Sequence, residues 1–171
     1  MSHQHIQSAI AEYAQAYERL QRLQESMPSI PGGDQKTGCI GEYYAYLYLL
    51  SLHDEKLLSY GSHSEKGWDI KIALNKPQRI QVKTVSAFSK TRTISPIHKG
   101  WDELYIIYLS KNLQPEGFWI IKDKTIFGTK HKITSAKCRN PNKTKTGSAI
   151  IPFGENRITE LRAALERATN A

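Results

Sequence analysis

A continuous apolar run from Leu104 to Leu109 constrains the fold of this chain more than any other feature. It reads Leu-Tyr-Ile-Ile-Tyr-Leu and has no polar face, which is typical of a central strand covered on both sides. A further strand is predicted at 117–121. Strands of this kind need a layered domain, and 171 residues are enough to bury the core of one.

Two alternating segments precede this run. Residues 67–74 and 79–85 each alternate apolar with polar side chains, and the turn-forming stretch 75–78 lies between them. A shorter strand is predicted at 56–60. We therefore expect a mixed β-sheet of about four to five strands.

Three helices are expected around this sheet, at about 6–24, 35–53 and 156–168. In the first, apolar residues recur every three or four positions, and a Pro- and Gly-rich loop follows. The order of elements predicts an α/β fold, with the sheet flanked by helices and an N-terminal helix. Residues 1–33 are assigned to that helix and a linker, and 34–171 to the main domain. The N-terminal helix is either an appendage to the core or a dimerisation element.

The second helix carries one acid in an otherwise apolar body. Residues 40–50 are apolar nearly all round, so the helix is expected to be buried, and Glu42 is the only acid there. A carboxylate in such surroundings is costly unless it is paired, protonated or bound to a metal. We expect the tyrosines of this helix to pack in the core rather than to stack on bases; they are Tyr43, Tyr44, Tyr46 and Tyr48.

Polar side chains on the two alternating strands form a candidate catalytic cluster. Asp69 lies on the polar face of the first strand, and Gln81 and Lys83 share the polar face of the second. A hairpin brings these three together, and Glu42 can approach from the side. Nucleases use such sets: carboxylates hold Mg²⁺, which activates a water and neutralises the phosphate, and the lysine stabilises developing charge. The alternative is that they are ordinary surface residues at strand ends.

The motifs around these residues resemble a known family. They are G-E-x₂-A-x₃-L in the helix, G-W-D-I-K-I at 67–72 and R-I-Q-V-K-T at 79–84. Over about residues 36–122 the chain resembles the PD-(D/E)XK nuclease superfamily, which has the restriction endonuclease-like fold. The resemblance implies a Mg²⁺ cofactor. It also implies a catalytic set of Glu42, Asp69, Gln81 and Lys83, and a metal shell of Asp69, Gln81, Glu42 and the backbone carbonyl of Val82.

This sequence departs from the family pattern at two positions. Trp68 stands where the family often has Pro, and Gln81 stands where it has an acid. An amide oxygen still coordinates Mg²⁺ but brings no charge. Glu42 and Asp69 keep two formal negative charges, which suffice for one metal ion. A second metal, or a base at residue 81, is less favoured.

The charge balance indicates a polyanionic partner. The formal net charge is +8, and Lys and Arg of the basic segment 124–148 supply most of it. Nucleic-acid contacts are expected from Ser86, Arg92, His98, Lys130, Lys132, Lys137, Arg139, Lys143 and Lys145. The alternative for the basic segment is a solvated loop.

Together these features predict a Mg²⁺-dependent type II restriction endonuclease that cuts double-stranded DNA as a homodimer. One chain offers one active site, whereas symmetric cutting of both strands needs two. The alternatives are a junction-resolving, homing or RNA-cutting nuclease of the same fold, or a nucleic-acid-binding module without catalysis. Only two isolated cysteines and no membrane-length apolar run are present, so we expect a cytoplasmic protein without membrane contact.

Overall fold

The computed structural model describes residues 2–26, 36–62, 67–89, 94, 97–122 and 154–170. Its helices are α1 (His3–Ser26), α2 (Lys36–Leu50) and α3 (Ile158–Asn170), with a short 3₁₀ turn at Glu55–Leu57. Its strands are β1 (Leu58–Tyr60), β2 (Ile70–Ile72), β3 (Gln78–Ser86), β4 (Glu103–Leu109), β5 (Pro115–Ile121) and β6 (Glu155–Asn156).

The strands form one mixed sheet in chain order, β1-β2-β3-β4-β5-β6. Only the β3–β4 pair is parallel; the other neighbours are antiparallel. The predicted α/β fold with a mixed sheet, flanking helices and an N-terminal helix is confirmed, but the sheet has six strands rather than four to five. The additional strand, β6, is two exposed polar residues, of which Asn156 was expected to begin the last helix. A pair of residues this short gives no alternation in the sequence that would predict a strand.

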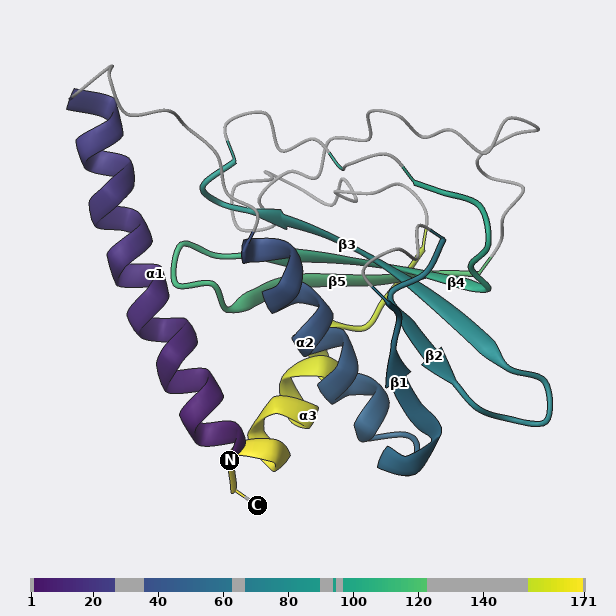
Figure 1. Cartoon of the computed structure of the whole chain (residues 1–171). Helices are drawn as coiled ribbons and strands as arrows, with labels where there is room; N and C mark the ends of the chain where they lie inside the picture. Colours follow the sequence, from purple (N-terminus) through teal and green to yellow (C-terminus); the bar gives the residue numbers. More distant parts are fainter. Residues whose placement is uncertain are drawn as a thin grey trace.

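The helices gather on one face of the sheet (Figure 1). On this face Tyr105, Ile107 and Leu109 of β4 join one core with residues of all three helices. On the other face, alternate β4 residues pack against Ile94 and Trp101 of the β3–β4 connection. The apolar run is therefore a central strand with both faces covered, as its sequence predicts.

Helix α1 is part of this core. Ile10 and Ala14 are buried in the same cluster as the residues of α2 and α3. The Tyr17 ring meets Phe88 edge-on, with ring centres 4.4 Å apart. Near its start, the Gln4 amide donates a hydrogen bond of 2.8 Å to the carbonyl of Thr169, so the two ends of the chain lie together (Figure 1). No helix in the described residues is long and apolar enough to cross a membrane.

A glycine sets how closely α2 approaches the sheet. A Cβ atom at Gly41 would lie 2.9 Å from both Cβ and Cγ2 of Thr84 in β3, and closer still to its hydroxyl oxygen. Any side chain larger than hydrogen would therefore push the helix away from the strand. Glu42 is the next residue, so its distance from β3 depends on this contact.

We predict that Gly41→Ala lowers the free energy of unfolding by about 1–3 kcal/mol, because overpacking forces the helix and strand apart. Gly38 of the same helix is the matched control, since nothing in the described structure lies within 4 Å of a Cβ placed there. Gly38→Ala should instead stabilise the helix by up to ~1 kcal/mol. Urea unfolding of both variants measures the contrast, and equal effects would argue against the close contact.

Candidate active site

The candidate site lies at the point where β2 stops pairing with β3. Strand β2 pairs with β3 only as far as Ile70 opposite Ile80. Just before β2, the backbone N–H of Asp69 donates a hydrogen bond of 2.8 Å to the carbonyl of Ile80. The N–H of Val82 lies beyond this pairing, and it donates a 2.6 Å hydrogen bond to the Asp69 carboxylate. The Asp69 side chain thus replaces a missing strand as the acceptor, which fixes its position against β3.

The carbonyl of Val82 faces the same edge. In a strand, the N–H and C=O of one residue point to the same side, so they bond the same neighbour. Arg79 uses the opposite side of β3, where its carbonyl accepts a hydrogen bond from Asp102. The Val82 carbonyl therefore lies on the same side of β3 as the Asp69 carboxylate.

Glu42 and Lys83 complete an ionisable cluster with Asp69. The pKa of Glu42 is raised to about 7, mainly by burial and also by the Asp69 charge, while Lys83 acts to lower it. Burial likewise raises the pKa of Asp69, against the Val82 hydrogen bond and Lys83, which lower it. Burial lowers the pKa of Lys83, while both acids act to raise it. The three side chains are half-buried, and their charges act on one another.

Gln81 holds two loops together. Its side chain is only 2% exposed. Its amide nitrogen donates a 3.1 Å hydrogen bond to the carbonyl of Gly67, and its amide oxygen accepts one of 3.1 Å from the His98 N–H. These two loops touch, since a Cβ at Gly67 would lie 2.5 Å from the carbonyl oxygen of Lys99. The predicted metal-ligand role of Gln81 stays a prediction, to which the structure adds that of a clamp.

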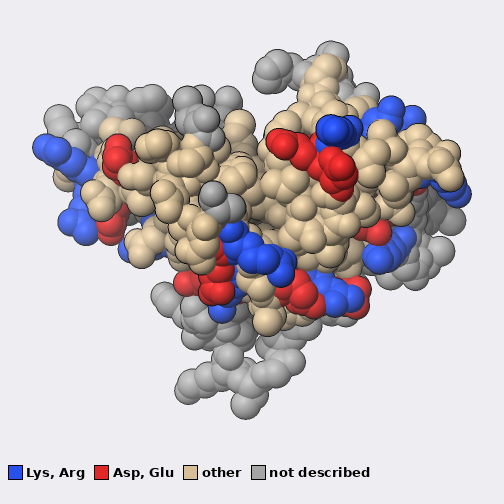
Figure 2. Space-filling model, turned by 90° about the horizontal axis from the view of Figure 1, so that it is seen from below, with Lys and Arg blue, Asp and Glu red and all other residues tan. Residues whose placement is uncertain are grey.

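The predicted nucleic-acid residues lie in different surroundings. His98 is exposed, and its proximity acts to lower the pKa of the Asp69 carboxyl. Ser86 is buried at the end of β3, which leaves little of it for a phosphate. The others lie outside the described residues: Arg92, Lys130, Lys132, Lys137, Arg139, Lys143 and Lys145. In Figure 2, acidic and basic side chains of the described residues are interspersed, and most of the positive excess falls in the remaining segments of the sequence.

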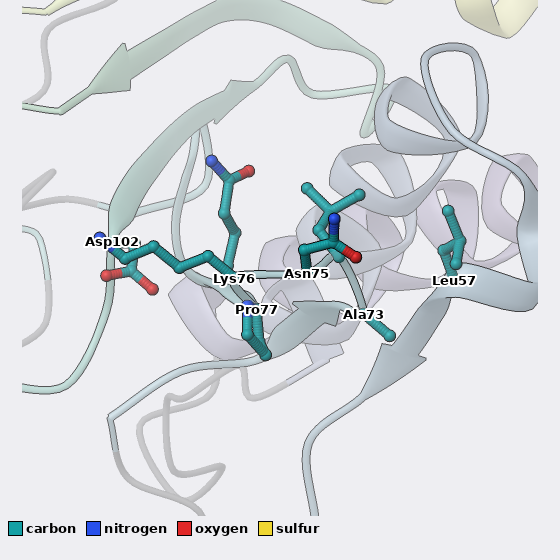
Figure 3. A pocket seen from close by; sticks show the side chains of 8 residues that line it. Leu57, Ala73, Asn75, Lys76, Pro77 and Asp102 are labelled. Atoms are coloured by element: carbon teal, nitrogen blue, oxygen red, sulfur yellow. The ribbon is translucent and has the colours of Figure 1, made fainter.

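A separate pocket opens beside the β2–β3 turn (Figure 3). It has a volume of about 670 Å³ and is lined by Leu57, Ala73, Lys76, Asp102 and their neighbours. The Asp102 carboxylate there accepts a hydrogen bond from the N–H of Arg79, so it holds the strand ends together. None of the clustered ionisable residues lines this pocket.

The donor set of the ionisable cluster suits Mg²⁺. Glu42 and Asp69 supply carboxylates and Val82 a carbonyl, all hard oxygen ligands of the kind this ion prefers. The two acids raise each other's energy in the charged form, which a cation between them would relieve. The described residues contain no cluster of three or more His, Cys, Asp or Glu side chains that could hold a metal. A site with two carboxylates suits one metal ion better than two metal ions.

The chain matches no protein-family model, and no curated protein matches it by sequence.

We predict that Glu42→Gln becomes more stabilising as pH rises. Because the folded-state pKa of Glu42 is about 7 against a usual value of 4.5, the folded state holds the proton more tightly than the unfolded state. Stability therefore falls as pH rises from about 4.5 through 7. Glutamine removes this loss. Thermal unfolding without divalent metal should show the variant gaining on wild type between pH 5 and pH 8; a difference independent of pH would contradict the raised pKa.

We also predict that Gln81→Glu destabilises the fold by about 1–3 kcal/mol at pH 8. The new carboxylate cannot donate to Gly67 and would face that carbonyl from a buried position. Gln78→Glu, half-buried on the same strand, is the control and should stay within ~0.5 kcal/mol of wild type. Urea unfolding measures both variants. If the free energy of unfolding of Gln81→Glu equals that of wild type, Gln81 does not hold the two loops together.

Proposed function

We propose that this protein is a Mg²⁺-dependent endonuclease that hydrolyses DNA phosphodiester bonds, a Q-x-K variant of the PD-(D/E)XK nuclease superfamily. The observation that carries the proposal is that Glu42, Asp69 and Lys83 lie together at the point where β2 stops pairing with β3. Two carboxylates and a lysine that share one partly buried cluster match the needs of phosphodiester hydrolysis.

Each residue of the cluster has a distinct role in this proposal. Asp69, Glu42 and the carbonyl of Val82 would hold the Mg²⁺, with the second lone pair of the Gln81 amide oxygen as a further ligand. The bound ion supplies an acidified water and neutralises charge on the phosphate. Lys83, whose ammonium form the two acidic neighbours favour, orients the attacking water and stabilises the negative charge that develops on the phosphate oxygens.

The environment of Lys83 favours this role over that of a surface lysine. Its burial disfavours the ammonium and lowers the pKa, and Asp69 and Glu42 offset part of that penalty. A half-buried lysine is less screened by water than a surface lysine, so its charge acts more strongly on groups close to it. The same argument explains why a buried helix tolerates Glu42, which Lys83 and a bound cation would both stabilise in the charged form.

The proposed enzyme type, oligomeric state and cellular compartment rest on the sequence alone. A type II restriction enzyme that cuts duplex DNA would act as a homodimer, because cutting both strands needs two copies of the site. The two isolated cysteines suit action in the reducing cytoplasm. The basic segment 124–148 would supply phosphate contacts.

We predict that Asp69→Asn abolishes cleavage of plasmid DNA in Mg²⁺ while leaving the fold intact. Asparagine keeps an oxygen to accept the Val82 N–H hydrogen bond and removes the charge that the metal needs. Asp69→Ala should also be inactive but less stable, by about 1–3 kcal/mol, because it leaves the Val82 N–H without its acceptor. Lys83→Met, similar in bulk, should lose cleavage and keep DNA binding.

An EDTA control shows whether cleavage needs the metal, and the products and substrates of cleavage separate the alternatives. Discrete fragments indicate a sequence-specific enzyme, smearing a nonspecific one, and cleavage of RNA or branched DNA alone would redirect the substrate assignment. DNA binding without cleavage of any of these substrates by the wild-type protein would refute the proposed enzyme activity and leave a binding module.

A further inference from the structure

An aromatic pair lies beside the acids of the candidate site. Glu42 and Tyr46 are four residues apart on α2, so they share one face of the helix. The Tyr46 ring stacks on Tyr60 at the end of β1, with ring centres 5.0 Å apart and planes 17° apart. The sequence predicted Tyr46 to be a packing residue only.

Tyr60 is joined to Asp69 through the backbone. Tyr60 pairs with Ile70 in the β1–β2 ladder, and the N–H of the following residue, Gly61, donates a 2.7 Å hydrogen bond to the Asp69 carbonyl. The charge of Glu42 also acts on the Tyr60 hydroxyl, where burial and the neighbouring groups raise the pKa. The stacked pair, Tyr46 and Tyr60, thus borders both acids of the cluster.

Tyr60 is partly exposed to solvent. Tyr60 as a residue is 49% exposed, although its hydroxyl is partly desolvated and Tyr46 stacks on its ring. The other large exposed apolar side chains of the described residues are single leucines, Leu20, Leu52 and Leu74, and such isolated cases are ordinary on a protein surface. Tyr60 differs from them because it is a preformed aromatic platform next to ionisable groups.

We propose that the Tyr46–Tyr60 stack is a nucleobase-binding subsite, which receives an unpaired base beside the phosphate at the Glu42–Asp69 cluster. An aromatic ring held by a stacked neighbour loses little freedom on binding, and any base offers it a π-face. A base inside an intact duplex is covered by its neighbours and cannot reach such a ring. The preferred substrate is therefore DNA with an unstacked nucleotide at the site, such as a single strand, a bulge or a fork. This inference rests on the proposed endonuclease activity, and it replaces the fully paired duplex with DNA that carries an unstacked nucleotide as the preferred substrate of the same site.

The test measures binding apart from cleavage. Fluorescence anisotropy in EDTA compares a single-stranded oligonucleotide, a bulged duplex and the fully paired duplex. Tyr60→Leu should bind the single strand and the bulge about 5- to 150-fold more weakly and the paired duplex within about twofold of wild type. Tyr60→Phe keeps the ring and should match wild type. Leu52→Ala, at a more exposed apolar side chain beyond the end of α2, is the control and should also match it.

Two outcomes overturn the subsite: equal weakening on paired and unpaired DNA by Tyr60→Leu, or no weakening at all. Tyr60→Trp covers the case in which leucine disturbs the fold, since it enlarges the ring and should bind the unpaired base at least as tightly as wild type; weaker binding would contradict the proposal. Cleavage by wild type in Mg²⁺ is scored separately. Base binding that depends on Tyr60 without cleavage refutes only the enzyme activity, and cleavage that is indifferent to Tyr60 refutes only the subsite.

Discussion

The hydrogen bond from the Val82 N–H to the Asp69 carboxylate is the contact on which the site depends. Strand β2 has three residues and stops short of Val82, so a backbone donor in the middle of the longer strand β3 would otherwise lack an acceptor. An acid at this point satisfies the donor and is thereby fixed in place. The Val82 carbonyl lies on the same side of β3 as the Asp69 carboxylate. Because β2 ends early, two oxygen atoms that could bind a metal ion lie on one side of β3.

The close packing of α2 adds the second acid. Gly41 lets the helix approach Thr84, and this approach buries Glu42 near Asp69 and Lys83. Three charged groups in a half-buried cluster are costly on their own account. A pKa of about 7 for Glu42 records that cost. In the function proposed above, a bound cation offsets this cost.

Local sequence patterns predicted much of the fold. Alternation predicted β2 and β3, the apolar run predicted β4, and the lone acid in the helix pointed to Glu42. The clamp of Gln81 and the stacking of Tyr46 on Tyr60 were beyond such patterns, because each joins segments distant in sequence. A glutamine in a buried strand and a tyrosine at a strand end have many possible partners, and only the tertiary arrangement selects one.

Calorimetric titration of Mg²⁺ into the metal-free protein, in buffers of different ionisation enthalpy, tests the central claim most directly, because it counts protons released on binding. With a Glu42 pKa of about 7, wild type should release about one proton per bound ion at pH 6 and almost none at pH 8.5. Glu42→Gln should release almost none at either pH. Absence of Mg²⁺ binding by wild type, or equal proton release by Glu42→Gln at pH 6, would contradict a metal site built on Glu42 and Asp69.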